Sequence, residues 1–392
     1  MTAIIKTGGR FTIGAGGIAQ IGTSSLLVPP PTVNDTGINA QSFHYELNDA
    51  NTGGLITYRT SSTQYVRELT ISGSTVTVGS EVTKDTGVTT ASTNRGFVRR
   101  YQSGGTPNYI AISVDNAASA SITARAFNSS AVAQTTDTTI DTAASFNRAN
   151  FGSRKDGGTQ MMVFAQDSGG IQYYVVTESG GSISVQNSGT VVSSGTPSLV
   201  NATDGVTDGR GLLLNSVNPG PGPVLRAYSI TGNDYSESST LVIGSTTSST
   251  GAVNQVAAIS TDIGLVLFWN GSEWTLRKVT GVEGTLALSG SELTPVPGHS
   301  SSHSIVITRL NNTQALLGWS DGNDLKYQAV DCSGASPVLT GDVKTLTRSA
   351  SMDFAFAVQG GWNGHWQYMS DGNVMASWVE SGDLRFAILN DL

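Results

Sequence analysis

The sequence predicts an all-β fold, a seven-bladed β-propeller of four-stranded antiparallel blades. Two observations lead to this prediction: one hairpin pattern recurs seven times, and the composition suits many short strands joined by tight turns. Among 392 residues, 47 are glycine and only 11 are proline, and charged residues make up 13%. Clustered Val, Ile, Leu and Tyr between Gly, Ser and Thr favour strands and turns over disorder.

The recurring unit is an apolar strand, a turn rich in Gly, Asn or Asp, and a second alternating strand. The first strands of the seven copies end at Tyr58, Val114, Ala165, Ser216, Trp269, Trp319 and Trp378. The successive intervals are 56, 51, 51, 53, 50 and 59 residues. A period of roughly 50 residues with several short strands is typical of propeller blades. We expect the recurring tryptophans to pack between blades.

Alternative repeat architectures fit the pattern less well. A β-solenoid normally has shorter repeats, and tandem sandwiches would not repeat one hairpin at this spacing. Four strands of about five residues, with their turns, fill one interval.

The last hairpin ends close to Leu392, which predicts that its outer strand comes from the start of the chain. We expect the segment at about 18–28 to pair with 384–389 and so to remove a free edge. Residues 1–41 would then be an N-terminal segment with this closing strand and a linker containing Pro29–Pro31. Residues 42–392 would form the propeller.

Charge and cysteine content limit the partners. The net charge of −8 and the pI near 5.0 do not provide the basic surface that nucleic acids require. No apolar run reaches the ~18 residues of a membrane span, and the first residues do not resemble a secretory signal. A single cysteine, Cys332, leaves no intrachain disulfide and no cysteine-rich metal site.

The patterns that would indicate catalysis are weak. His299 and His303 are the one close histidine pair, but no glutamate follows as in a metalloprotease helix. Arg99 and Arg100 are adjacent and should point to opposite faces of a strand, unlike the arginine cluster of a sialidase. A carboxylate pair for glycoside cleavage is not readable from sequence, because its separation is spatial. We therefore expect no enzyme.

We also expect no cofactor and no metal site. Turns such as Asp321–Asp324 and Asp204–Asp208 contain oxygen ligands, and calcium there remains an open alternative. Asp-Gly is more often a turn former.

One stretch stands out as a candidate binding feature. The segment 360–373 lies in the longest interval and contains Trp362, His365, Trp366 and Tyr368 in a glycine-rich setting. Their flat faces and polar tips suit a sugar ring or a protein partner. In the alternative interpretation Trp366 and Tyr368 belong to strands and pack between blades. We favour packing for Tyr368 and leave both interpretations open for Trp362.

The pattern of an apolar strand ending in Trp, an Asp/Ser-Gly turn and a Leu-x-Tyr/Phe-x-x-Val strand resembles propellers of bacteriophage virion proteins. Tail-fibre and tail-tip components are among these. The resemblance covers about residues 42–392 and carries no diagnostic motif. The Gly-His and Trp-Asp dipeptides of WD40 repeats are absent, and the double glycine of kelch repeats does not recur.

The resemblance implies a non-enzymatic structural protein of the phage virion, made in the host cytoplasm. Other virion proteins are its expected partners, with host-surface polysaccharide and further copies of the chain as candidates. A carbohydrate-binding lectin outside a virion is the first alternative, and a glycoside-cleaving propeller is the second.

Overall fold

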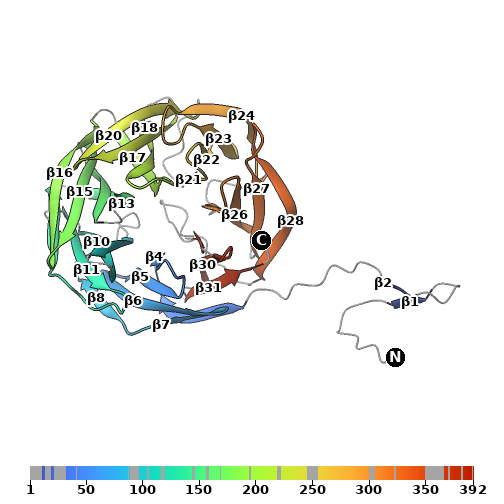
Figure 1. Ribbon diagram of the computed structural model, residues 1–392, viewed down its shortest axis with the longest axis horizontal. Coiled ribbons are helices and arrows are strands. Elements are labelled where there is room, and N and C mark those ends of the chain that lie inside the picture. Colours follow the sequence, from blue (N-terminus) through green and yellow to red (C-terminus); the bar gives the residue numbers. More distant parts are fainter. Residues whose placement is uncertain are drawn as a thin grey trace.

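The computed structural model is a ring of seven β-sheets around a central axis (Figure 1). All regular elements among the described residues are strands, and the predicted all-β, seven-bladed propeller is confirmed. No helix in the described part of the chain is long and apolar enough to cross a membrane. The structure describes residues 11–13, 19–21, 32–40, 42–86, 88, 97–103, 106–115, 120–143, 146–155, 159–167, 169–193, 196–218, 222–244, 255–299, 305–321, 324–348, 366–369, 371–380, 383–390 and 392.

Each blade is an antiparallel meander that begins beside the axis and proceeds outward. Blade 1 comprises β4 (Ser42–Leu47), β5 (Gly53–Thr60), β6 (Thr63–Ser72), β7 (Thr75–Val78) and β8 (Val82–Asp85). Blade 2 comprises β9 (Phe97–Ser103), β10 (Thr106–Asp115), β11 (Ala120–Asn128) and β12 (Thr138–Ala143). Blade 3 comprises β13 (Phe146–Lys155), β14 (Gln160–Asp167), β15 (Gly170–Ser179) and β16 (Ser182–Val192).

The remaining blades repeat this order. Blade 4 comprises β17 (Thr196–Asp204), β18 (Arg210–Asn218), β19 (Pro223–Thr231) and β20 (Asp234–Val242). Blade 5 comprises β21 (Gln255–Ala258), β22 (Ile263–Trp269), β23 (Trp274–Thr280) and β24 (Ala287–Leu293). Blade 6 comprises β25 (Ile305–Arg309), β26 (Gln314–Asp321), β27 (Asp324–Asp331) and β28 (Val338–Arg348). Blade 7 comprises β29 (Gln367–Tyr368), β30 (Val374–Glu380), β31 (Asp383–Leu389) and β3 (Val33–Asn39).

The second and third strands of every blade are the hairpins that repeat in the sequence. They are apolar because both faces of a blade pack against neighbouring blades. Trp269 and Trp319 are buried in one apolar cluster between blades 5 and 6, and Trp378 is buried between blades 6 and 7. The expected packing of the recurring tryptophans between blades is confirmed.

The outer strands differ from the hairpins in both composition and regularity. The second strand β22 is buried at every position but the first, whereas the outer strand β20 has no buried residue. In blade 1 two short strands take the position of the outer strand, because β7 and β8 pair with different parts of β6. In blades 2 to 6 the outer strand shows a register shift against its neighbour. Bulges bend and twist a strand and make it a poorer template for pairing with another chain.

The ring closes through β3, which pairs with β31 as the outer strand of blade 7. The Thr36 hydroxyl donates to the carbonyl of Leu384 at 2.8 Å, and Asp35 forms an ion pair with Arg385. A backbone hydrogen bond from Gly37, followed by the Arg385 contact, lowers the pKa of Asp35. The expectation that an N-terminal strand closes the ring is confirmed.

The position predicted for the closing strand, at about 18–28, is wrong. Within that range β2 (Ala19–Ile21) pairs with β1 (Phe11–Ile13), and Pro29–Pro31 lies outside the described residues. The segment 18–28 was predicted because it is more apolar than β3. An outer strand at the perimeter buries little surface, so the polar sequence of β3 suits the position better.

Blades 1 and 7 also contact each other directly, through hydrogen bonds and apolar side chains. The Tyr45 hydroxyl donates to the carbonyl of Met375 at 2.6 Å, and the Leu47 amide donates to Gln367 Oε1 at 3.1 Å. The Tyr45 ring meets Phe386 edge-on, with centroids 5.6 Å apart. Ile38 of β3 belongs to the same apolar cluster.

The closing strand provides a test of this interface. Ile38 is 2% exposed and Val33 on the same strand is 39% exposed. We expect Ile38→Ala to lower the free energy of unfolding by about 2–4 kcal/mol, because it leaves a cavity between the first and last blades. Val33→Ala should change it by less than ~0.5 kcal/mol. Chemical denaturation followed by tryptophan fluorescence measures both, and equal small effects would show that β3 does not hold the ring.

Candidate functional site

A pocket of about 220 Å³ lies on the axis of the ring, and the innermost segments of all seven blades line it. It is somewhat smaller than the ~300–1,000 Å³ of pockets for drug-sized molecules, which suits one sugar unit or a ligand of similar size. Six of its lining residues come from six different blades: Phe97, Phe151, Asn201, Gln255, Ile307 and Trp366.

Strand register places these residues at one level of the axis. The inner-strand residues of blades 2 to 6 lie opposite Ile112, Val163, Leu214, Leu267 and Leu317. Each of these partners lies two residues before the recurring hairpin position of its blade. Trp366 directly precedes β29, where Gln367 pairs with Met375. Aromatic rings from blades 2, 3 and 7 therefore face amide groups from blades 4 and 5.

A second level, two residues further along the inner strands of blades 2 and 6 and three further in blade 3, carries three arginines. Arg99, Arg154 and Arg309 pair with Ile110, Met161 and Ala315, each four residues before the hairpin position. Blades 2, 3 and 6 thus place a guanidinium at equivalent heights. Arg99 and Arg309 line the pocket.

Two of these arginines belong to a charge cluster that joins four blades. Glu46 of blade 1 lies 3.4 Å from Arg99 and 3.5 Å from Arg154. Asp204 of blade 4 lies 3.3 Å from Arg154 and also contacts Arg99. Burial, with the charge of Arg99, lowers the pKa of Arg154 to about 10, so it stays charged at neutral pH. The two positive and two negative charges balance.

The same cluster bears on two expectations from the sequence. Arg100 pairs with Asp49 instead of joining Arg99, as expected for adjacent strand residues. The carboxylates of Glu46 and Asp204 each contact both Arg99 and Arg154. The geometry suits holding blades together better than proton transfer.

Arg309 is in a different situation. Its Nη2 donates to Asn312 Oδ1 at 2.7 Å, within the turn that follows β25. Among the described residues no carboxylate lies within ion-pair distance of Arg309. Its charge is therefore the one on the pocket wall that this part of the chain does not balance.

The predicted binding stretch contributes one described residue to the pocket. Trp366 is 5% exposed, lines the pocket and packs so closely on Gly318 that a Cβ there would lie 2.3 Å from the indole. Tyr368 is 36% exposed and does not line the pocket. It pairs with Val374 on β30, close to the turn between the two strands. Its side chain is therefore more exposed than the predicted packing between blades requires. Trp362 and His365 lie outside the described residues.

The histidines and acidic turns considered as metal ligands were the other candidates from the sequence. In the described part of the chain no group of three or more His, Cys, Asp or Glu side chains could hold a metal. His299 lies 3.8 Å from Asp321, which also contacts Lys326, and His303 is outside the described residues. In the two candidate calcium turns, Asp321 and Asp204 are thus engaged by basic side chains.

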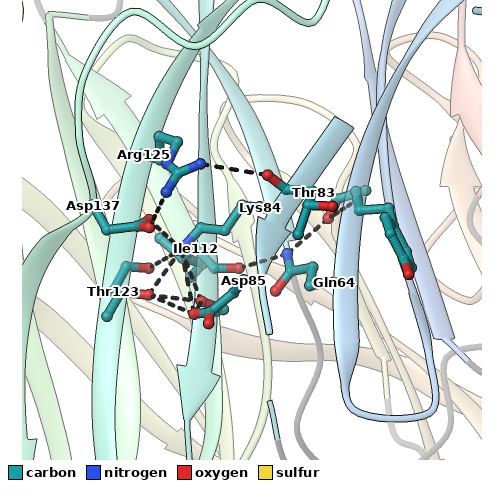
Figure 2. A network of polar contacts seen from close by, with 11 residues as sticks. Gln64, Thr83, Lys84, Asp85, Ile112, Thr123, Arg125 and Asp137 are labelled. Atoms are coloured by element: carbon teal, nitrogen blue, oxygen red, sulfur yellow. Dashed lines mark hydrogen bonds and ion pairs between the residues drawn. The ribbon is translucent and has the colours of Figure 1, made fainter. Parts of the chain in front are cut away.

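A second polar cluster joins blades 1 and 2, away from the axis (Figure 2). Lys84 of β8 has no exposed side-chain surface, and its Nζ donates to Ser113 Oγ and Thr123 Oγ1, each at 2.8 Å. The Asp137 carboxylate lies 3.0 Å from Nζ, and Asp85 accepts from Ser113 at 2.8 Å. Burial lowers the pKa of Lys84, and Asp137 opposes that shift. Because Lys84 is inaccessible and well coordinated, we interpret this cluster as a structural joint.

The fold and the axial pocket define the class of the protein: it is a seven-bladed β-propeller. No family model and no curated protein matches its sequence. Among solved structures it is similar to a putative 6-phosphogluconolactonase from Bacteroides fragilis, with a TM-score of 0.55 and 10% identity over 78% of this chain and 84% of that chain. It is also similar to the WD40 domain of coronin from Toxoplasma gondii, with a TM-score of 0.53 and 9% identity over 92% and 84%. At these identities the likeness shows the fold alone.

Most of the pocket escapes sequence reasoning, since among the described lining residues only Trp366 belongs to the stretch that the sequence singles out. The arginines share an offset only through their strand partners, each four residues before the hairpin position. Counted along the chain, Arg99, Arg154 and Arg309 lie 15, 11 and 10 residues before that position, so the sequence alone does not reveal their common level.

The joint between blades 1 and 2 can be tested by removing its charge. We expect Lys84→Met to lower the free energy of unfolding by about 3 kcal/mol, near the low end for a broken buried pair because its carboxylates are partly exposed. Lys326→Met, which breaks a partly exposed pair with Asp321, should cost less than ~1 kcal/mol. Thermal and urea denaturation compare the two variants. A stability of Lys84→Met equal to that of the native protein would contradict the structural role.

Proposed function

We propose that this propeller is a non-catalytic binding platform that holds a saccharide in its axial pocket. We further propose that it serves as a structural, host-contacting component of a phage particle. The observation that carries the first part is the pocket itself, to which all seven blades contribute. A site on the axis exists only when the whole ring is assembled, so its geometry is fixed by the fold.

The lining suits a sugar unit. Phe97, Phe151 and Trp366 supply apolar walls, whereas Asn201 and Gln255 supply amide groups at the same level. Sugar rings combine apolar faces with hydroxyl groups, and pockets for such ligands pair mostly apolar walls with a few placed polar groups. Gln255 is itself positioned, because its Oε1 accepts from the amide of Ile307 at 2.9 Å.

Rigidity supports the platform role. The inner strands of blades 1 to 4, which line one part of the pocket, are tied together by the cluster of Glu46, Arg99, Arg154 and Asp204. A site held in place before binding loses less conformational freedom when the ligand arrives. Weak single-site affinity would then be multiplied by many copies on one particle.

The setting in a virion is supported by the repeat pattern and by polar outer strands such as β16, which contains no charged residue. A lectin outside a virion would use the same pocket and is the second candidate. Glycoside cleavage has less support, because the carboxylates beside the pocket are bound by arginines.

Filling the pocket tests the binding site. Thr203 lines the pocket at the level of the arginines and is partly exposed, and we expect Thr203→Trp to abolish glycan binding on an array. Val242→Trp on the outer strand of the same blade introduces the same side chain at the perimeter and should leave binding unchanged. Matching melting temperatures establish that both variants fold. Undiminished binding by Thr203→Trp would place the site elsewhere.

Purified particles test the setting. We expect mass spectrometry of gradient-purified virions to find this chain in a fixed copy number, and antibody labelling to locate it on the particle exterior. A chain that is abundant in infected cells but absent from particles would favour the lectin alternative.

A further inference from the structure

We infer that the axial pocket selects an acidic saccharide unit, and that Arg309 binds its carboxylate. This inference rests on the proposed function and names the ligand class of the same pocket.

The charge of the described pocket wall has the opposite sign to that of the chain. The chain carries 29 acidic and 21 basic residues. The described residues that line the pocket nevertheless include Arg99 and Arg309 and no carboxylate. A low-dielectric site of one sign concentrates ligands of the other sign.

The two arginines have different roles. Arg99 forms ion pairs with Glu46 and Asp204, so its charge is already balanced by acids of blades 1 and 4. Arg309 has one hydrogen bond among the described residues, to the neutral amide of Asn312, which occupies only Nη2. A guanidinium presents a fork of further N–H donors that matches a carboxylate in a bidentate arrangement. Arg309 is thus the group on the wall best suited to bind an anion.

The surroundings of Arg309 fit the rest of a sugar acid. The neighbouring blade contributes Trp366, whose indole is fixed against Gly318 of blade 6. The preceding residue, Thr308, also lines the pocket, and Gln255 reaches the same wall from blade 5. An apolar face, a hydroxyl and an amide beside one guanidinium suit a ring that carries hydroxyls and a single planar acid group.

A carboxylate suits this wall better than a phosphate. A phosphate ester carries a charge of roughly −1.5 to −2 at neutral pH and usually needs several cationic or backbone donors. The described wall offers one guanidinium that is not already paired with acids, and its planar fork matches a planar group.

The experiment compares matched ligands and matched variants. Isothermal titration or array binding would use glucuronate against glucose, galacturonate against galactose, sialic acid, and glucose 6-phosphate. Arg309→Met removes the proposed contact. Arg277→Met, which breaks an ion pair with Glu292 on blade 5, removes a surface arginine away from the pocket. Melting temperatures report whether each variant folds.

We expect the native protein to bind the carboxylate sugars at least ~10-fold more tightly than their neutral counterparts, and more weakly as salt increases. Arg309→Met should lose about 10- to 100-fold in affinity for the acidic sugars and keep its weak affinity for the neutral ones. Arg277→Met, the control, should bind both kinds of sugar like the native protein. Arg309→Lys should fall between, because it keeps the charge and loses the fork.

Four outcomes overturn the inference. Equal affinity for acidic and neutral sugars, or unchanged acidic affinity in Arg309→Met, removes Arg309 as the determinant while saccharide binding stands. Tighter binding of glucose 6-phosphate than of any uronate replaces the carboxylate with a phosphate. No binding of any saccharide to the native protein overturns the proposed function itself.

Discussion

The pairing of β3 with β31 is the constraint on which the rest of the structure depends. Each blade has two apolar faces, and in a ring every face meets a neighbour. If β31 lacked its outer partner, the apolar cluster between blades 1 and 7 would lose Ile38 and the other contacts of β3, and its outer side would be uncovered. A closed ring therefore requires that the two ends of the chain share one sheet.

Closure also creates the axis on which the pocket lies. No single blade could form this pocket, because among the described residues each blade supplies at most four of the lining residues. The repeat makes their heights equivalent, and the differences between repeats decide their chemistry. Phe151, Asn201 and Gln255 occupy corresponding positions of three successive blades and give one aromatic and two amide groups.

The sequence reveals the parts of the fold that repeat and hides the parts that occur once. The hairpins whose first strands carry Trp269, Trp319 and Trp378 are visible because burial between blades demands apolar residues at a fixed period. The closing strand β3 occurs once and is polar, so neither the repeat period nor apolar composition identifies it. The pocket is hidden for a related reason: inner strands face the axis with one edge, and that edge tolerates phenylalanine, asparagine or glutamine at equivalent heights.

The contrast between Lys84 and Arg309 shows how this structure separates a joint from a site. Lys84 is enclosed and held by two hydroxyls and a carboxylate at 2.8–3.0 Å, so a cation that would be costly to bury alone is compensated within the fold. Arg309 stands at a wall where the described chain supplies one neutral amide and leaves the charge unbalanced. Under the proposed function, Arg309 is therefore the group that is available to an external anion. Arg99, which is paired with two acids, instead holds neighbouring blades together.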